Sequence, residues 1–383
     1  MDAPVRDTRS MHDRSKQRPE KFGCIIAGGG TGGHIFPALA IAHALKKIQP
    51  DLRVLFVGAK GKMEMEKVPQ AGFQIEGIDI AGFNRSSLIK NLGLPWKLIR
   101  SFFQVRQIFR VFKPDAVIGV GGYSSFPVLR FAQSKGIATF IHESNAFAGK
   151  ANMLLGRNAT RIFVASTGME KFFPAKKIQV TGNPVRSSIV NDNISRNEAV
   201  QSFGLDPSRK TILVIGGSLG AKSINEAIDA GLGILQDNKL QLIWQTGKPY
   251  AAKAKRAAEG LEHIWVGDFI TQMELAFAAA DVVVSRAGAM TIAELCVVGK
   301  PVIFVPYPFA AEDHQTANAM NLVDRKAGIL VKDDLAKQSL VHEIVSLAGD
   351  PDRQDMFKNN IKKLAIVDAD VVIASEILKT IHD

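Results

Sequence analysis

Two glycine-rich loops carry the most specific chemical signal in this sequence. Residues 28–34 read Gly-Gly-Gly-Thr-Gly-Gly-His and residues 216–221 read Gly-Gly-Ser-Leu-Gly-Ala, each between an apolar run and a helical segment. Unhindered backbone amides at the positive end of a helix suit a diphosphate or another oxyanion. Neither loop continues into the Gly-Lys-Ser or Gly-Lys-Thr of a P-loop, and the first departs from the dinucleotide spacing. The loops therefore favour a phosphate-bearing ligand other than ATP or NAD.

Three side chains near the first loop could move a proton. His34 closes that loop, at a position that opens into the crevice beyond the carboxyl ends of the strands in a Rossmann-like domain. Imidazole can take up a proton near neutral pH. His142 and Glu143 follow an apolar run at 137–141 and are expected to face the same crevice. The alternative for His34 is a helix-start histidine that makes only local hydrogen bonds.

One acid stands out in the second half of the chain. Ser285–Glu294 runs from a predicted strand end into a helix that carries Glu294. A carboxylate in this place is often only a helix-dipole or capping partner. If it faces a nucleotide, it can instead accept both ribose hydroxyls. Residues 313–316 also follow a predicted strand end, so we expect the polar groups of both halves to converge on one cleft.

The elements that must position these residues follow a regular alternation. From Phe22 onward, short β-branched runs alternate with helical segments, which is typical of parallel βαβ construction. The predicted strands are 23–27, 53–58, 116–120, 137–141 and 161–165, then a second series that begins at Thr211 and continues at 240–244, 263–266, 281–285 and 301–305. The predicted fold class is α/β, with two Rossmann-like parallel-sheet domains facing across a cleft.

Length and composition agree with two folded domains. The chain has 383 residues, 46% of them hydrophobic and 22% charged, which excludes a disordered protein. We expect an unstructured tail at 1–20, an N-terminal domain at 21–190 and a C-terminal domain at 191–366, with the polar stretch 191–209 as the junction. Two cysteines cannot form a disulfide scaffold, so a reducing compartment is the simpler interpretation. The tail lacks the apolar core of a secretory signal, and no apolar stretch reaches the roughly 18 residues of a membrane span.

Several motifs together resemble the MurG family in order and spacing. They are Gly-Gly-Thr-Gly-Gly-His at 29–34, Gly-Gly-Tyr-Ser-Ser-Phe-Pro at 121–127, His-Glu-Ser-Asn at 142–145, Gly-Asn-Pro-Val-Arg at 182–186, the loop at 216–221, and the segments that end at Glu294 and Gln315. The resemblance implies the GT-B architecture, with a last helix at 367–383 that packs back on the first domain. It implies inverting transfer of N-acetylglucosamine from UDP-N-acetylglucosamine to the 4-hydroxyl of N-acetylmuramoyl-pentapeptide in lipid I, an undecaprenyl diphosphate, which gives lipid II for peptidoglycan synthesis.

The same resemblance implies contacts for the donor from both domains. Thr31, Gly32, Gly33 and Asn145 would reach it from the N-terminal side; Arg186 and Ser218 would hold the diphosphate; the backbone of Ile270 would meet the uracil; Ala289, Met290, Thr291 and Glu294 would hold the diphosphate and ribose; and Gln315 would hold the sugar. Tyr123 and His142 would lie on the acceptor side. Ser144 and Leu219 stand where many members have glutamine.

An inverting transfer needs a base for the acceptor hydroxyl and positive groups for the departing UDP. We assign the base to His34, with Glu143 as the second choice. The Asp-x-Asp strings, 350–352 and 368–370, lie in the polar C-terminal region, whereas metal-dependent enzymes of this kind commonly place one at a strand end. Helix termini and Arg186 can take over the electrostatic role of a metal. We therefore expect no cofactor and no obligate protein-bound metal.

The positive charge of the chain is concentrated in one region. Residues 80–190 contain 16 Lys or Arg and three acids, whereas the formal net charge of the whole chain is +11. Basic and apolar residues alternate at 80–114 without any acid. We expect an anionic membrane surface to contact this region, through Phe83, Arg85, Lys90, Trp96, Lys97 and Arg100. The alternative is an amphipathic core helix with a solvated basic face.

Two other interpretations fit less well. The sequence contains no helix-turn-helix, zinc or RNP-type pattern that would indicate binding of nucleic acid. A sugar-nucleotide epimerase on the same two-domain fold would explain the glycine loops, but it would leave the basic region without a role. With the resemblance, the prediction is a peripheral protein at the cytoplasmic face of the bacterial cell membrane, which could also meet other cell-wall synthesis proteins.

Overall fold

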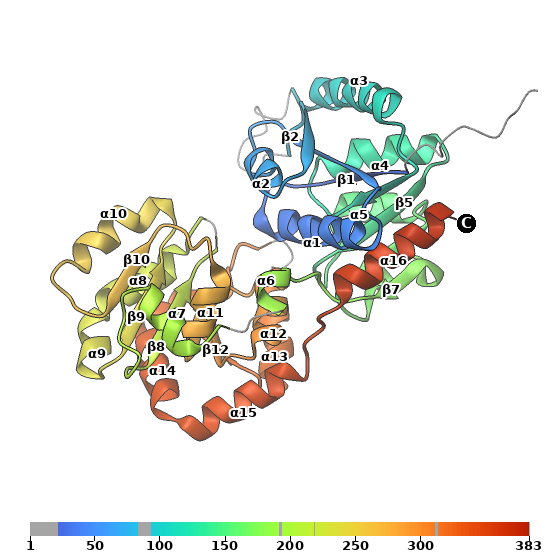
Figure 1. The fold of residues 1–383 in the computed structure, drawn as a ribbon. Helices are drawn as coiled ribbons and strands as arrows, with labels where there is room; N and C mark the ends of the chain where they lie inside the picture. Colours follow the sequence, from blue (N-terminus) through green and yellow to red (C-terminus); the bar gives the residue numbers. More distant parts are fainter. Residues whose placement is uncertain (1–21, 83–92, 191–193, 218, 311–312, 383) are drawn as a thin grey trace, which may run out of the picture.

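The computed structural model describes residues 22–82, 93–190, 194–217, 219–310 and 313–382, which form two lobes, each built around a parallel sheet (Figure 1). The first sheet has the strand order β3-β2-β1-β4-β5-β6-β7. Its strands are β1 (Gly23–Ala27), β2 (Arg53–Ala59), β3 (Gln74–Ile78), β4 (Ala116–Gly119), β5 (Ala138–Glu143), β6 (Arg161–Val164) and β7 (Ile178–Val180). The order reverses between β1 and β4, which is the switch point where doubly wound sheets bind ligands.

The second sheet repeats this plan with the order β10-β9-β8-β11-β12-β13. Its strands are β8 (Thr211–Ile215), β9 (Gln241–Gln245), β10 (Ile264–Gly267), β11 (Val282–Ser285), β12 (Val302–Phe304) and β13 (Ile329–Leu330). All pairings in both sheets are parallel. The predicted fold class, two Rossmann-like parallel-sheet domains, is therefore confirmed.

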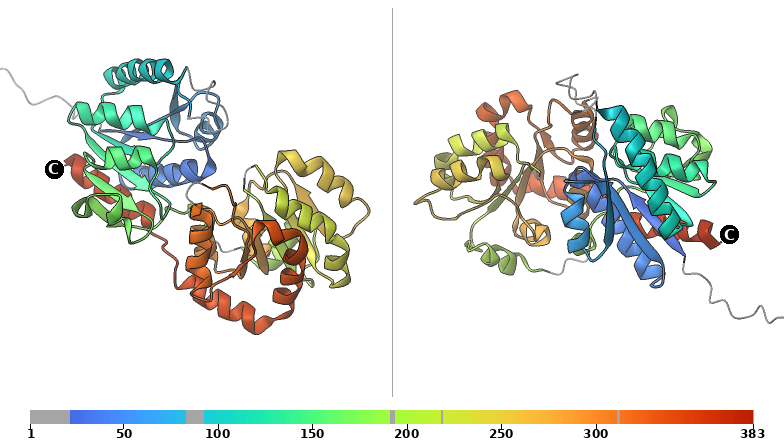
Figure 2. Two further views of the ribbon diagram at one scale, coloured as in Figure 1. Left: turned by 180° about the vertical axis from the view of Figure 1, so that it is seen from behind. Right: turned by 90° about the horizontal axis from the view of Figure 1, so that it is seen from above.

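Helices cover both faces of each sheet (Figures 1 and 2). Those beside the first sheet are α1 (Gly32–Ile48), α2 (Glu64–Gln70), α3 (Leu94–Phe112), α4 (Ser125–Ser134), α5 (Lys150–Gly156) and α16 (Ala369–His382). The others are α6 (Ser187–Val190), α7 (Arg196–Ser202), α8 (Lys222–Ala230), α9 (Leu232–Asp237), α10 (Lys248–Ala257), α11 (Met273–Ala279), α12 (Ala289–Val298), α13 (His314–Val323), α14 (Ala336–Gly349) and α15 (Pro351–Lys362). Short 3-10 turns occur at 169–171, 175–177 and 333–335.

The central strands are buried on both faces, as parallel sheets between helices require. Every residue of β1 is buried, and successive side chains point to opposite faces. Cys24 and Ile26 join the core beneath α1 and α16, whereas Ile25 and Ala27 join the core beneath α3 and α4. The apolar runs that predicted these strands are thus the centres of two cores.

The last helix returns to the first sheet (Figure 1). Ile373 and Ile377 of α16 are fully buried in one core with Ile41 and Leu45 of α1. An ion pair between Arg161 and Glu376, 3.0 Å long, joins α16 to β6. The C-terminal helix therefore completes the core of the N-terminal sheet.

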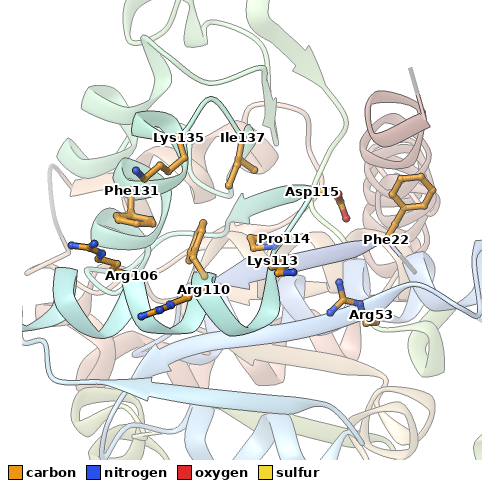
Figure 3. Close-up of a pocket in the computed structure, with 11 residues that line it drawn as sticks. Phe22, Arg53, Arg106, Arg110, Lys113, Pro114, Asp115, Phe131, Lys135 and Ile137 are labelled. Carbon is orange, nitrogen blue, oxygen red and sulfur yellow. The ribbon is translucent and has the colours of Figure 1, made fainter. Parts of the chain in front are cut away.

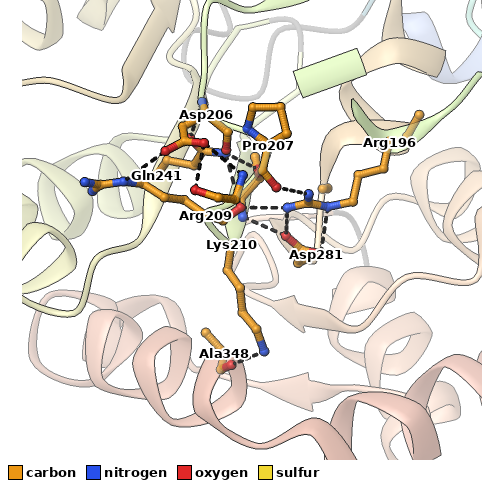
Figure 4. A network of polar contacts seen from close by, with 12 residues as sticks. Arg196, Asp206, Pro207, Arg209, Lys210, Gln241, Asp281 and Ala348 are labelled. Carbon is orange, nitrogen blue, oxygen red and sulfur yellow. Dashed lines mark hydrogen bonds and ion pairs between the residues drawn. The ribbon is translucent and has the colours of Figure 1, made fainter. Parts of the chain in front are cut away.

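The stretch between the two strand series contains a helix that sequence inspection did not predict. Ser195 caps α7 through a capping box with Glu198, and Ala199 and Val200 are buried in the core of the second sheet. Figure 4 shows how Arg196 of α7 is held by Asp281, with distances of 3.1 and 2.6 Å, and by the carbonyl of Arg209 at 2.7 Å. This helix belongs to the second core rather than to a free linker.

Three strands and the end of β5 also differ from the prediction, whereas the ends of the other predicted strands agree within one residue. β3, β7 and β13 were not predicted. All three are outer strands; β7 and β13 have only three and two residues, and β3 carries polar residues that alternate with apolar ones. β5 extends to Glu143, so His142 and Glu143 lie within the strand rather than after it. Within the described residues, no helix combines the length and apolarity needed to span a membrane.

Candidate active site

The first glycine loop packs directly against the turn that follows β4. Gly28, Gly29 and Gly30 have φ values of +148°, +148° and +87°, a region that favours glycine. The amide of Gly29 donates to the carbonyl of Gly121 at 3.3 Å. A Cβ on Gly122 would lie 2.5 Å from the carbonyl oxygen of Gly29. Glycine is required here because the backbones of two adjacent strand ends touch.

A residue absent from the sequence prediction fills part of this loop. Glu64, at the start of α2, is 1% exposed. Its Oε2 accepts from the amide of Gly30 at 2.8 Å, and its Oε1 accepts from the amide of Ala59 at 3.0 Å. The sequence offered one signal for Glu64. It comes five residues after β2, and because β2 lies beside β1, the carboxyl ends of these two strands are neighbours. The N–H of Gly30 is thus already hydrogen-bonded to a carboxylate of the protein itself.

His34 lies in the first turn of α1, half-buried, with its ring against the same loop. Its Nδ1 is 3.0 Å from the carbonyl oxygen of Gly29 and 3.3 Å from Oγ1 of Thr31. Burial lowers the pKa of His34, while the Gly29 carbonyl and the charges of Glu143 and Glu64 act in the opposite direction. A carbonyl can only accept, so Nδ1 carries the proton and Nε2 is left with its lone pair.

His142 and Glu143 are both buried within β5. Burial lowers the pKa of His142 to about 4, so the ring is neutral near pH 7. Its Nδ1 is 3.4 Å from Oγ of Ser144, and its buried Nε2 has no hydrogen-bond partner among the described residues. A neutral, fully buried imidazole is poorly suited to contact a charged ligand directly.

The carboxylate of Glu143 is engaged on both oxygens. Oε1 accepts from the backbone and side-chain amides of Asn145, at 3.1 and 3.3 Å. Oε2 accepts from the amide of Gly149 at 3.1 Å and from Nδ2 of Asn152 at 2.9 Å. Glu143 therefore fastens residues 144–152 to β5. It also fixes Asn145, one of the predicted donor contacts.

Two predicted donor contacts, Arg186 and Glu294, meet each other. Nε and Nη2 of Arg186 both lie 2.8 Å from Oε1 of Glu294, and the guanidinium stacks 4.8 Å from the ring centroid of Phe36 in α1. Burial raises the pKa of Glu294, and Arg186 pulls it the other way. The pair joins the segment after β7 to α12, and Phe36 of the first domain packs against the guanidinium.

Asn183 is a second link between the domains. Its Nδ2 donates to the carbonyl of Ser144 at 3.1 Å and to the carbonyl of Ala289 at 3.4 Å. Its buried Oδ1 has no partner in the described part of the chain. The sequence contained the motif 182–186, but without the fold nothing indicated that Asn183 bridges two domains.

The remaining predicted residues of the second domain lie near carboxyl strand ends. Ala289, Met290 and Thr291 form the first turn of α12, whose leading amides have no partner within the helix. The amide of Ile270 donates to Oε1 of Gln245 at 3.3 Å, and Oε1 of Gln315 accepts from the amide of Tyr307 at 2.9 Å. Ser218 lies outside the described residues.

The predicted residues of the first domain converge in a similar way. Thr31 precedes α1, Gly32 and Gly33 form the first turn of that helix, and Tyr123 lies beside the loop, with its ring about 4 Å from where a Gly30 Cβ would be. Leu219, one of the two departures from the family, is 80% exposed. No group of three or more His, Cys, Asp or Glu suited to a metal ion occurs within the described ranges.

A separate cavity of about 890 Å³ lies away from these strand ends, between α3, α4 and the amino ends of β1 and β2 (Figure 3). Its lining combines the cations Arg53, Arg106, Arg110, Lys113 and Lys135 with the apolar Phe22, Phe109, Pro114, Phe131 and Ile137, and with Asp115. It is a basic surface feature, separate from the glycine loops at the carboxyl strand ends.

Two parallel-sheet domains, joined across their carboxyl strand ends, give this chain the GT-B architecture, and two family matches identify it as a glycosyltransferase. Residues 24–164 match the glycosyltransferase family 28 N-terminal domain, and residues 211–371 match the C-terminal domain of that family. The chain belongs to the MurG family of these enzymes.

Two relatives support this assignment to the family, and a third protein shares only the fold. A Phocaeicola vulgatus protein named UDP-N-acetylglucosamine--N-acetylmuramyl-(pentapeptide) pyrophosphoryl-undecaprenol N-acetylglucosamine transferase is 49% identical over 363 residues, covering 94% of this chain and 96% of the relative. The crystal structure of Acinetobacter baumannii MurG is 30% identical with a TM-score of 0.72, covering 94% of this chain and all of that one. A putative UDP-N-acetylglucosamine 2-epimerase from Listeria monocytogenes has a TM-score of 0.68 over 95% of this chain and 97% of that one, but at 15% identity it shows only the shared fold.

Proposed function

We propose that this enzyme transfers N-acetylglucosamine from UDP-N-acetylglucosamine to the 4-hydroxyl of the N-acetylmuramoyl-pentapeptide in lipid I, forming lipid II. The observation that carries this proposal is the similarity, across both domains and nearly the whole chain, to relatives named for that transfer. The epimerase alternative has only the fold in its favour.

The donor lies on the second domain in this proposal. The free amides of the first turn of α12 face the diphosphate, where the helix dipole favours negative charge. Glu294 receives the ribose hydroxyls. Because Glu294 is paired with Arg186 in the structure, donor binding has to exchange that contact, which frees the guanidinium for the diphosphate.

His34 is the base in this proposal. Its Nδ1 proton is held by the Gly29 carbonyl, which leaves Nε2 to take the proton of the acceptor hydroxyl as that oxygen attacks the anomeric carbon. Charge then grows on the departing UDP, where Arg186 and the α12 amides stabilise it. Glu143 is less suited to be the base, because four N–H groups already hold its carboxylate.

The test is release of UDP from UDP-N-acetylglucosamine with and without a lipid I analogue. The expected result is release only with the acceptor, with one N-acetylglucosamine added to it in the inverted, β configuration. Conversion of the donor to an epimer without any acceptor would overturn the proposal in favour of the epimerase.

The proposed position of the enzyme is peripheral, at the cytoplasmic face of the cell membrane. One face of α3 carries Trp96, Ile99 and Phe103, followed at the same helical spacing by Arg106 and Arg110. Trp96 is 76% exposed and Phe103 67%, so these rings are not core residues. Apolar rings beside cations suit an anionic lipid surface.

The cavity beside α3 extends this surface, because Arg106 and Arg110 line it (Figure 3). Of the residues predicted to contact the membrane, Trp96, Lys97 and Arg100 lie on α3, and Arg100 pairs with Asp79 at 3.2 Å. Phe83, Arg85 and Lys90 fall outside the described residues. Other cell-wall synthesis proteins are proposed partners at the same membrane face.

A further inference from the structure

One peptide group lies between His34 and Glu64. Its carbonyl, that of Gly29, is 3.0 Å from Nδ1 of His34, and its N–H, that of Gly30, donates to Oε2 of Glu64 at 2.8 Å. The carboxylate, the peptide unit and the imidazole thus form one continuous chain of hydrogen bonds. We propose that Glu64 is a positioning residue that acts on His34 through the Gly29–Gly30 peptide.

The chain works by polarisation. A carboxylate that accepts from the N–H end of a peptide makes its carbonyl oxygen a stronger acceptor, since linked hydrogen bonds reinforce one another. The stronger acceptor holds the proton on Nδ1 of His34 and keeps Nε2 basic. When Nε2 takes up a proton, the Gly29 carbonyl and the negative charge of Glu64 stabilise the imidazolium, as the charges acting on the pKa of His34 indicate.

The surroundings of the Glu64 carboxylate are suited to this side chain. Both oxygens of Glu64 accept from backbone N–H groups. A Cβ on Gly29 would lie 2.3 Å from the carboxyl carbon, and one on Gly58 would lie 2.5 Å from Cγ of Glu64. Two glycines therefore leave room for this side chain. The other titratable groups that face the His34 ring are Glu143 and His142, both on β5.

The rival explanation is that Glu64 only ties α2 to the loop. A merely structural residue would lower stability without changing the proton chemistry of His34. Glu64→Gln is the sharpest variant, because it keeps the shape and removes the charge. Glu66→Gln is the matched control, since Glu66 lies two residues away on the same helix with a side chain that is 66% exposed.

The first experiment needs no activity. Nitrogen-15 NMR of the imidazoles in the full-length enzyme is expected to show His34 with its proton on Nδ1 and, in Glu64→Gln but not Glu66→Gln, a pKa moved to lower pH. An unchanged His34 pKa in folded Glu64→Gln overturns the inference. If Glu64→Gln does not fold, the parent protein alone still decides, because a proton found on Nε2 overturns the chain of hydrogen bonds.

The second experiment uses kinetics and rests on the proposed function. Replacing the carboxylate that directly contacts the histidine of a catalytic triad costs about 10⁴ in turnover, so an action through one peptide group should cost less, on the order of 10-fold to 100-fold. We expect Glu64→Gln to lower kcat by this factor at an unchanged donor KM, and to move the acid limb of the pH profile to lower pH. In the His34→Ala background it should have no further effect.

The outcomes separate the two proposals. An equal loss from Glu64→Gln with and without His34 overturns the positioning role. Full activity of His34→Ala overturns the assignment of the base, and hence the kinetic role of Glu64, whereas the NMR result still stands or falls by itself.

Discussion

The two domains use the same device, a strand that ends in a glycine turn before a helix, in different ways. In the first domain, the Gly30 amide donates a hydrogen bond to Glu64, and the carbonyl of Gly29 in the same loop accepts one from His34. In the second, the hydrogen bonds found for the described residues of 216–221 involve Gln245 and backbone groups, with no carboxylate among them. Gly220 packs against Thr246, where a Cβ would lie 2.0 Å from the carbonyl oxygen. A loop with an internal anion suits the positioning of a base, and a loop without one suits a substrate phosphate.

This contrast predicts that changes in the two domains affect different measured quantities. Changes at His34 should act on turnover, changes at α3 on the use of a lipid acceptor, and changes at Glu294 on donor binding. An effect of any of these changes on one of the other two measurements would contradict this division of roles.

The largest effect is expected for His34→Ala. Loss of a general base usually costs about 10² to 10⁴ in rate, so kcat should fall by that factor while the donor KM changes little. His342→Ala, an exposed position on α14, is the control. Near-normal turnover of His34→Ala would place the base elsewhere, and Glu143→Gln would be tested next.

The next effect concerns the α3 surface. Replacing Lys97, Arg106 and Arg110 with Gln should weaken binding to anionic vesicles by on the order of 10²-fold, because each cation near such a surface contributes about 1 kcal/mol. Use of a long-chain acceptor should fall with it, while a short water-soluble acceptor is processed normally. Arg100 is kept because it pairs with Asp79.

The matched control replaces three exposed cations of α10, Lys248, Lys255 and Arg256, with Gln. This variant changes the net charge equally but lies on the second domain, so it should bind vesicles as the parent does. Equal loss in both triple variants would show an effect of net charge alone. Loss on the short acceptor would show that α3 serves the active site or the fold.

A smaller effect is expected for Glu294→Gln. Hydrogen bonds to a charged group contribute about 1.5–3 kcal/mol, so the donor KM should rise by on the order of 10-fold to 100-fold with little change in kcat, since a ribose contact binds ground and transition states alike. Gln keeps a side-chain oxygen for Arg186. A pure turnover defect would contradict the placement of Glu294 on the ribose.

Sequence patterns predicted the parts of the molecule that depend on local order. The apolar runs of β1 and β8 and the glycines after them are contiguous, so the two domains and their loops could be predicted. Contacts between distant residues could not. Arg186 and Glu294 pair across 108 positions, which requires knowing how the domains meet, and Glu64 reaches the loop only because β2 lies beside β1. The saturation of Glu143 by four donors is equally invisible until residues 144–152 are folded.

The smallest predicted effect is a dependence of stability on pH that comes from His142. Its pKa is lowered by burial from 6.5 to about 4, so the unfolded chain binds the proton more tightly than the folded one. Stability from this residue is therefore fully present above pH 6.5 and is lost as the pH falls toward 4. Between pH 7 and pH 5 the loss should be about 2 kcal/mol of unfolding free energy. His142→Gln should remove this part of the acid sensitivity, and the exposed His342→Gln should not. Glu294 changes the unfolding free energy in the opposite direction as the pH falls, because its pKa is raised by burial. The difference between variant and parent therefore isolates the contribution of His142.

Denaturant unfolding at pH 7 and at pH 5 measures this change in unfolding free energy. Equal acid sensitivity in His142→Gln and the parent would mean that the ring is not kept neutral by burial in β5, and that it could contact the acceptor as a cation.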